Sequence, residues 1–356
     1  MNILIGYGFS PTTTGRYIEE AFPPNDRVTY VGRADGRAGY ASDVDLVNLV
    51  QKIGIRPDLF LYVDSGHSAY LPRNIEKLEC PTAAYLIDVH LGTRLRRPLA
   101  GLFDYVFLAQ RDYIEQYRLG VDQHAEWLPL ACDPAVHRPM NLERLYDVGF
   151  VGRADPAEPR SAMLHALQAR YSMNDYHRPY TREEMATVYN RSRIVFNHSI
   201  RDDLNMRVFE AMACGALLVT NRIGNGLLEL FEDGKHLVTY ETQEEMLARV
   251  AFYLEHEDAR EAIAREGQSR VLSEHTYACR AERILSVVFR DAPGARGPLR
   301  DASESRRIAQ YAELYSKFRL LDASFETLKQ AHLTRQSRLA ALAQFGAALL
   351  RRAKYG

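Results

Sequence analysis

The sequence predicts an α/β protein with two doubly wound, Rossmann-like parallel sheets, followed by a helical C-terminal extension. Short, fully apolar segments alternate with segments of helical period along most of the chain, which is the rhythm of β-α-β units. The rhythm breaks once, in residues 125–145, where three prolines interrupt a stretch without a long apolar period. The length of 356 residues also exceeds that of a typical single domain, so we expect two.

Residues 1–140 are expected to form the first Rossmann-like domain. Its strands are predicted from apolar runs that end near Gly, Ser, Asp or Gln: NILIGY, LFLYVDS, AAYLID and YVFLAQ. Helical periodicity predicts helices over DVDLVNLVQKIG and RDYIEQYRLG, and the second stops at Gly120. Together these segments predict a parallel sheet that is covered on both faces.

Residues 141–290 are expected to form the second Rossmann-like domain. Its first strand is predicted over residues 147–151, and RIVFNHS, ALLVTN and HLVTY are the next strands. Thr181, followed three positions later by Glu184, spells a capping box at the start of one helix. The predicted helices are PRSAMLHALQARY, TREEMATVYN, QEEMLARVAFYLEH and DAREAIAREGQSRVLSEH.

Residues 291–356 differ from the rest in composition. A linker, DAPGARGPLRDASES, precedes two helical segments, and no acidic residue follows Glu326 although Lys and Arg continue. We expect this extension to pack on the core or on a second copy of the chain, and a basic amphipathic membrane contact is the alternative. Because both α/β halves would be complete by then, truncation after about residue 295 is expected to leave nucleotide binding intact.

Composition disfavours several classes of protein. The formal net charge is −1, which gives no global attraction to nucleic acid. Four widely spaced cysteines without a C-x-x-C pair argue against a zinc site and for reduced thiols. No stretch approaches the about 20 apolar residues of a membrane span, and the N-terminal apolar run is too short for a signal peptide. We therefore expect a cytoplasmic protein, with peripheral contact to the inner face of the membrane as the alternative.

Polar residues gather where the predicted strands of the second domain end, which is where open α/β sheets bind ligands. The stretch FNHSIRDDLNMRVFEAMACG leaves a strand and enters a helix near Asn205 and Met206. Free amides at such a helix start favour an anion, and Arg207 adds a charge-assisted contact to phosphate. Glu210 follows one turn later, where its carboxylate can accept both hydroxyls of a ribose. A surface ion pair between Arg207 and Glu210 is the alternative.

Two pairs of polar residues in the first domain require separate interpretations. Asp88 and His90, in LIDVHLG, come just after a predicted strand and point to a site at the sheet edge, with simple loop capping as the alternative. Asp43 and Asp45 form a D-x-D pair, but they open a helix directly after Ser42. We therefore expect helix capping by Ser42, with the two aspartates as acids of the first turn, rather than a metal site, and no metal is predicted.

The stretch VFEAMACGALLVTN, followed by GNGLLELFEDGKHLVTY, resembles the donor half of GT-B glycosyltransferases. In that fold two Rossmann-like domains face each other across a cleft. YDVGFVGR and HTYACRAERIL are similar to the spore-maturation CgeB-like branch, which is bacterial. The resemblance covers roughly residues 80–290. It implies an acceptor-side first domain, and a second domain that binds a UDP-, GDP- or TDP-sugar as co-substrate, without a permanently bound cofactor.

The resemblance also implies roles for individual residues. Relatives carry two glutamates eight positions apart, one for the sugar and one for the ribose; Glu210 matches the second, and Asp202, one methylene shorter, occupies the first position. Asp88 and His90 would lie beside the donor sugar or the acceptor. The implied catalytic residues are Asp88, His90 and Asp202. The implied donor-binding residues are Gly152, Arg153, Asn205, Met206, Arg207, Glu210, Gly224, Asn225 and Gly226.

The expected activity is metal-independent transfer of a sugar from a nucleotide-sugar, with retention of configuration slightly favoured because the donor phosphate can assist. Inversion would instead use Asp88 or His90 as a general base. A nucleotide-sugar epimerase of the same fold and a non-catalytic nucleotide-sugar-binding module are the alternatives. An NAD-dependent oxidoreductase is disfavoured, since GYGFSPTTTGR places its third glycine at residue 15 rather than 11. The acceptor stays open among protein, glycan, lipid-linked sugar and small molecule.

Overall fold

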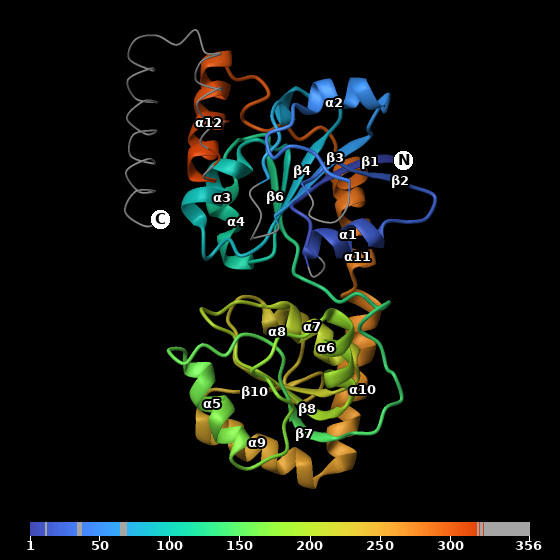
Figure 1. The fold of residues 1–356 in the computed structure, drawn as a ribbon, viewed down its shortest axis with the longest axis vertical. Coiled ribbons are helices and arrows are strands. Elements are labelled where there is room, and N and C mark those ends of the chain that lie inside the picture. The colour runs from blue at the N-terminus through green and yellow to red at the C-terminus, as the bar shows by residue number, and fades with distance from the viewer. Residues whose placement is uncertain (11–12, 34–37, 65–69, 319, 321–322, 324–356) are drawn as a thin grey trace. The chain divides into compact units, whose positions relative to one another are not determined.

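The computed structural model describes residues 1–356 except 11–12, 34–37, 65–69, 319, 321–322 and 324–356 (Figure 1). The chain divides into two compact units. The first contains Met1–Leu128 and the described residues from Arg283 on, and the second contains Pro129–Glu282. The chain therefore leaves the first unit and later returns to it, whereas the sequence suggests three consecutive segments that meet at residues 140 and 290.

The first unit is built on a six-stranded parallel sheet in the order β2-β1-β3-β4-β5-β6, flanked by helices (Figure 1). β3, β4 and β5 are buried along their whole length, as their apolar sequences predict. The strands β2 and β6 lie at the two edges, and their mixed sequences, RVTY and HAEW, give no apolar run. The strands are β1 (Asn2–Gly6), β2 (Arg27–Tyr30), β3 (Leu59–Val63), β4 (Thr82–Leu86), β5 (Tyr105–Leu108) and β6 (His124–Trp127).

The helices of the first unit are short and defined by local caps. Asp45 caps α2 by accepting the backbone N–H of Asn48 at 3.1 Å, so the cap is Asp45 and not Ser42 as predicted. Gly54 ends α2 in the left-handed region, with φ 65°, which a residue with a Cβ rarely adopts. These helices are α1 (Thr14–Ala21), α2 (Leu46–Ile53), α3 (Thr93–Ala100) and α4 (Ile114–Tyr117), with 3₁₀ turns at Ile75–Lys77 and Arg111–Tyr113.

The second unit contains a four-stranded parallel sheet in the order β10-β9-β8-β7. Thr181 and Glu184 form the predicted capping box at the start of α6. The strands are β7 (Tyr146–Gly149), β8 (Ser192–Asn197), β9 (Leu217–Asn221) and β10 (Val238–Tyr240). The helices are α5 (Pro159–Gln168), α6 (Arg182–Asn190), α7 (Met206–Ala213), α8 (Leu227–Leu230), α9 (Gln243–Glu255) and α10 (Glu257–Glu274). α11 (Tyr277–Ser286) carries the chain back toward the first unit.

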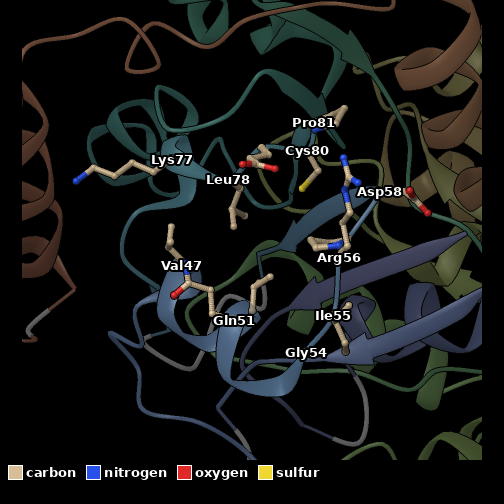
Figure 2. A pocket seen from close by; sticks show the side chains of 13 residues that line it. Val47, Gln51, Gly54, Ile55, Arg56, Asp58, Lys77, Leu78, Cys80 and Pro81 are labelled. Carbon is tan, nitrogen blue, oxygen red and sulfur yellow. The ribbon is translucent and has the colours of Figure 1, made fainter.

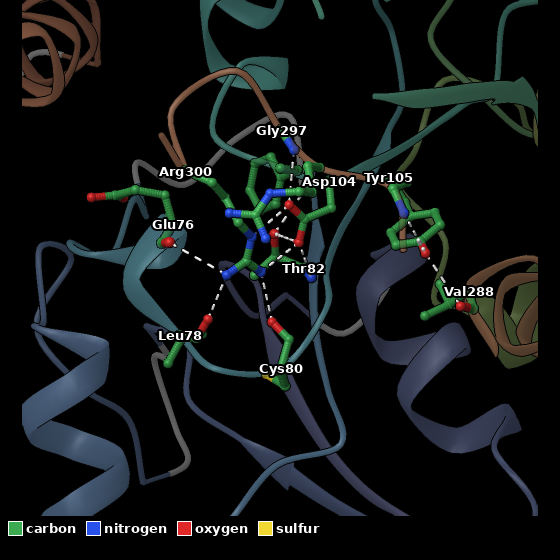
Figure 3. Close-up of polar contacts among 12 residues, drawn as sticks. Glu76, Leu78, Cys80, Thr82, Asp104, Tyr105, Val288, Gly297 and Arg300 are labelled. Atoms are coloured by element: carbon green, nitrogen blue, oxygen red, sulfur yellow. Dashed lines mark hydrogen bonds and ion pairs between the residues drawn. The ribbon is translucent and has the colours of Figure 1, made fainter. Parts of the chain in front are cut away.

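The residues after α11 are anchored to the first unit rather than forming a free linker. Arg300 donates from Nε to the carboxylate of Asp104 at 2.7 Å, and its terminal nitrogens reach the carbonyls of Leu78 and Cys80 at 2.6 and 2.7 Å (Figure 3). Asp104 is 1% exposed and also accepts the backbone N–H of Gly297 at 2.9 Å. A π-helical turn (Val287–Asp291) and α12 (Glu304–Lys317) complete this return segment, residues 287–317.

The return segment corrects the reason given for the truncation prediction, because the first α/β unit is not complete at residue 295, while nucleotide binding by a truncated chain stays a prediction. Cutting there removes Arg300 and α12, whose Tyr311 hydroxyl donates to the buried carboxylate of Glu76 at 2.8 Å. The second predicted C-terminal helix, residues 337–356, lies outside the described residues. In the part of the chain that the structure describes, no helix has the length and apolarity to cross a membrane.

Candidate functional site

Arg207 connects the carboxyl ends of β7 and β8 in the second unit. It lies in the first turn of α7, and its guanidinium carbon is 4.4 Å from the ring centroid of Phe150. It donates to the carbonyl of Val151 at 3.0 and 2.7 Å and to Oδ1 of Asn197 at 2.6 Å. The guanidinium is therefore held at the sheet edge where an open α/β fold binds its ligand.

Gly152 is required by this arrangement. It has φ 155°, and a Cβ added there would lie 2.2 Å from a terminal nitrogen of Arg207. A larger residue would push the guanidinium away from the strand ends. Arg153, the next residue, is exposed, so its side chain can reach a ligand at the same edge.

Arg160 is a second buried cation at this edge, and sequence reasoning missed it. It lies in the first turn of α5, is 8% exposed, and has its guanidinium carbon 5.6 Å from the Phe150 centroid. Burial and the positive charges of Arg207 and Arg153 together lower the pKa of Arg160 to about 10, against the opposing charge of Glu158, whose carboxylate lies 3.2 Å away. Within the described residues, its Nε is buried without a hydrogen-bond partner. The signal in the sequence was Pro159 at a helix start, since proline at the first helical position marks one.

We call Arg153, Arg160 and Arg207 the arginine cluster. Like charges at close range repel one another, so an anion with more than one negative charge would offset the repulsion within the cluster. The first turn of α7 adds to this. Asn205 stands at its N-cap but donates its side-chain amide to Asn197 at 3.2 Å instead of capping, and the start of a helix favours an anion. Met206, the first residue of α7, is half-buried there.

Asp202 shapes the glycine loop that follows β9. Its Oδ1 accepts the backbone N–H of Gly224 at 2.6 Å, and a Cβ on Gly224 would lie 2.7 Å from its Oδ2. Asp202 itself has a φ of 59°. Asn225 is buried, and Gly226, with φ 89°, starts α8. The acidic residue expected at the sugar thus also fixes the Gly224–Gly226 loop beside it.

Glu210 is buried inside the second unit. It is 5% exposed, so the alternative of a surface ion pair with Arg207 does not apply. Burial raises the pKa of its carboxyl to about 7, and the charge of Arg207 opposes this. Oε1 of Glu210 lies 3.6 Å from Nε2 of His137, which is 0% exposed. His137 belongs to the proline-rich stretch of residues 125–145, here called the crossover, in which no site residue was predicted.

Asp88 and His90 lie in the loop after β4 of the first unit, and both are half-buried. Asp88 has φ 52°, and its carbonyl accepts the N–H of Leu91 at 3.0 Å, which closes a turn. Gln110, which follows β5, accepts the N–H of Val89 at 3.2 Å and braces the loop. The predicted residues of this unit therefore lie on a defined turn at the carboxyl edge of the first sheet.

A cavity of about 630 Å³ lies away from these residues, at the amino ends of β3 and β4 (Figure 2). Apolar side chains such as Ile55 and Leu78 line it, with Arg56 and Lys77 at its border. None of the predicted site residues lines it. Its size alone does not make it the functional site, because ligands of parallel α/β sheets bind at the opposite edge.

The comparisons with known proteins agree with this geometry. Residues 141–286, which lie mostly in the second unit, match the protein family described as glycosyl transferase-like. A glycosyltransferase from Rickettsia africae has a TM-score of 0.58 at 11% identity, over 80% of this chain and 97% of that one. The structure of Anabaena Alr3699/HepE in complex with UDP-glucose has a TM-score of 0.58 at 16% identity, over 81% of this chain and 99% of that one.

The fold is that of the GT-B glycosyltransferases. Sucrose-phosphate synthase from Thermosynechococcus elongatus gives the same result, with a TM-score of 0.58 at 11% identity over 80% of this chain and 98% of that one. The predicted fold class of two Rossmann-like parallel sheets is thus confirmed. No curated protein matches the chain by sequence.

Proposed function

We propose that the protein is a glycosyltransferase that uses a nucleotide-sugar, and that its second unit binds the donor. The arginine cluster carries this proposal. Arg160 and Arg207 lie against the ring of Phe150, and Arg153 follows Gly152, at the carboxyl edge of a Rossmann-like sheet inside the region that matches the glycosyl transferase-like family. A nucleoside diphosphate supplies the charge that such a cluster lacks.

The proposed chemistry follows the charge that develops when the sugar leaves. The bond between the sugar and the diphosphate breaks, and the arginine cluster with the first amides of α7 stabilises the negative charge left on the phosphates. Because fixed cations supply this stabilisation, no divalent metal is needed. The ribose is assigned to Glu210, and the sugar to Asp202 and the loop Gly224–Gly226.

The choice of donor and of stereochemistry belongs to the proposal. UDP is the first nucleotide to test, because the Anabaena relative was crystallised with UDP and with UDP-glucose, and GDP and TDP are the next. Retention of configuration is favoured, with phosphate assistance. Asp88 or His90 on the first, acceptor-side unit would be the base of an inverting reaction. We also propose a bacterial, cytoplasmic enzyme of the CgeB-like branch, from YDVGFVGR and HTYACRAERIL.

A nucleotide screen by thermal shift, followed by slow hydrolysis of the matching nucleotide-sugar without acceptor, tests the proposal. Stabilisation by UDP, GDP or TDP but not by NAD supports it, because a ligand that binds only the folded state raises its stability. Release of free sugar from the donor identifies a transferase, and an epimerised nucleotide-sugar identifies the epimerase alternative. Binding without either product would indicate a non-catalytic module, and no stabilisation by any nucleoside diphosphate would refute the donor site.

A further inference from the structure

A single turn in the crossover, residues 133–137 (DPAVH), brings a histidine to α7. The backbone N–H of His137 donates to the carbonyl of Asp133 at 2.7 Å, which closes the turn. The carboxylate of Asp133 accepts the N–H of Ala135 at 2.9 Å and fixes its start. The position of His137 is therefore set by local hydrogen bonds and does not depend on a ligand.

The same turn determines which imidazole nitrogen carries the proton. The backbone N–H of Asp133 donates to Nδ1 of His137 at 3.2 Å, so Nδ1 is the acceptor in the neutral ring. The proton then resides on Nε2, the atom that lies 3.6 Å from Oε1 of Glu210. A buried N–H thus lies beside a buried carboxylate, at a distance slightly longer than that of a hydrogen bond, so that a small movement of either side chain would close the contact.

Other charged and titratable groups surround this pair. Arg207 on α7, Tyr189 on α6 and the thiols of Cys132 and Cys214 interact electrostatically with Glu210. Burial raises the pKa values of Tyr189, Cys132 and Cys214, so these groups stay neutral near pH 7. The groups that interact electrostatically with His137 are Arg182 and Glu183 on α6.

Near neutral pH the imidazole acts as a dipole and not as a charge. Burial and the positive charge of Arg182 together lower the pKa of His137 to about 4. Glu210, in contrast, titrates close to neutrality because burial raises its pKa to about 7. An N–H donor beside the carboxylate favours its ionised form. Only this form carries no proton, so both of its oxygens act purely as hydrogen-bond acceptors.

We propose that His137 is a positioning residue, whose Nε2–H keeps the carboxylate of Glu210 ionised and oriented to accept the two ribose hydroxyls of the donor. The part of this proposal that concerns the ribose rests on the proposed function. The effect of His137 on Glu210 is a property of the ligand-free protein. The two parts can therefore be tested separately.

Three substitutions distinguish the N–H from the mere presence of a side chain. His137→Gln carries an amide nitrogen the same number of bonds from Cβ as Nε2, and so it can still donate to Glu210. His137→Asn offers its oxygen where Nδ1 lies, which keeps an acceptor for the Asp133 N–H, but it is too short to reach Glu210. His137→Phe removes both contacts, and His137→Asn keeps the test open if the phenylalanine variant does not fold.

Infrared titration of the ligand-free protein measures the carboxyl of Glu210 directly, with the band assigned by its loss in Glu210→Gln. The wild type and His137→Gln are expected to titrate near the same pH. In His137→Asn and His137→Phe the midpoint should move up by about one pH unit, because the ionised form loses its donor. An unchanged midpoint in both of these variants would overturn the proposal.

Calorimetric titration with UDP between pH 5 and 9 tests the functional part. Affinity should fall on acidification in the wild type, and the midpoint of this fall should move up by the same about one pH unit in His137→Asn but not in His137→Gln. If UDP binds and all variants share one pH profile, His137 has no positioning role. If the wild type binds no nucleoside diphosphate, the proposed function fails, and the infrared titration still decides whether His137 controls Glu210.

Discussion

Arg300 in the first unit is half-buried and Arg160 in the second is buried, each where strands of a parallel sheet begin or end, but their surroundings differ. Arg300 meets the buried carboxylate of Asp104 and several backbone carbonyls (Figure 3). Burial opposes its charge, yet the hydrogen bond to Asp104 and the negative charge of Asp104 together outweigh burial, so the pKa of Arg300 is raised. Arg160 has two further arginines nearby, and its pKa is lowered to about 10 by burial and their charges.

This difference separates a structural arginine from one that we propose binds the ligand. The charge of Arg300 is balanced by the buried carboxylate of Asp104, so its interactions stabilise the fold. Three arginines form the cluster, and the carboxylates of Glu158 and Glu210 balance their charge only in part, so an anionic ligand would complete the compensation. Substitution of Arg300 should therefore lower the stability of the fold, whereas substitution of Arg160 should lower the affinity for the ligand.

The largest expected effect is at Arg300. Arg300→Ala leaves Asp104 buried without its cation, which should lower the free energy of unfolding by about 3–5 kcal/mol. Trp127, the one tryptophan of the sequence, lies on β6 and reports unfolding of the first unit by fluorescence in urea. Arg296→Ala is the matched control: Arg296 is 54% exposed and pairs with the exposed Asp301, so its loss should change the free energy of unfolding far less than the loss of Arg300. Equal losses in the two variants would contradict a structural role specific to Arg300.

A smaller effect is expected from the ionisation of Glu210 without ligand. Its pKa is raised from 4.5 to about 7, so the folded protein binds more protons than the unfolded chain between these values. The stabilisation that the raised pKa of Glu210 gives the folded state is therefore complete below pH 4.5 and is lost as the pH rises through 7. The free energy of unfolding falls by about 3 kcal/mol at most over this range. Urea unfolding followed by circular dichroism at pH 5 and pH 8 measures it.

Glu210→Gln is the reference, because His137 titrates in the opposite sense. The pKa of His137 is lowered from 6.5 to about 4, so its contribution is lost as pH falls through this range. The stability of the wild type relative to Glu210→Gln should therefore decrease from pH 5 to pH 8. A difference that is flat with pH would show that Glu210 is not ionising in the buried state.

Arg160→Ala should behave in the opposite way to Arg300→Ala. Without ligand its free energy of unfolding should change by about 1 kcal/mol or less, because the loss of packing on Phe150 is offset by relief of repulsion from Arg207. Affinity for UDP should fall about tenfold to a hundredfold, since a hydrogen bond to a charged group contributes about 1.5–3 kcal/mol. Arg170→Ala, an exposed arginine just after α5, is the control and should leave both quantities unchanged.

The smallest expected effect is that of metal removal. EDTA should leave donor hydrolysis and transfer close to the untreated rate, because the arginine cluster and the helix amides stabilise the leaving diphosphate. Assays with EDTA and with added magnesium or manganese measure this. A strict requirement for either cation would show that the cluster does not suffice for the leaving group.

The sequence predicts the parts of the fold that depend on local patterns. The central strands are apolar runs, and the capping box at Thr181 is a local signature. Sequence patterns do not show pairings between distant residues. Arg300 contacts Asp104, 196 positions away, from a stretch whose Gly, Pro and Asp content is typical of a linker. Edge strands such as β2 are mixed in polarity and escape a search for apolar runs.

The candidate site was predictable to a similar extent. Asn205, Arg207 and Glu210 stand at the start of a helix after a strand, which is a local signal for an anion site. Arg160 and His137 were missed, since their relation to α7 depends on how separate segments pack. The burial of Glu210 was also not predictable, because the sequence does not show that the crossover covers this face of α7.

The most direct test of the donor site is a calorimetric comparison of UDP with uridine on the wild type, Arg207→Ala and Glu210→Ala. Arg207 is assigned to the diphosphate, so its loss should weaken UDP about tenfold or more and leave uridine nearly unchanged. Glu210 is assigned to the ribose, so its loss should weaken both ligands about tenfold to a thousandfold. If Glu210→Ala bound UDP as tightly as the wild type, or if Arg207→Ala weakened UDP and uridine equally, the assignment of the donor site would be wrong.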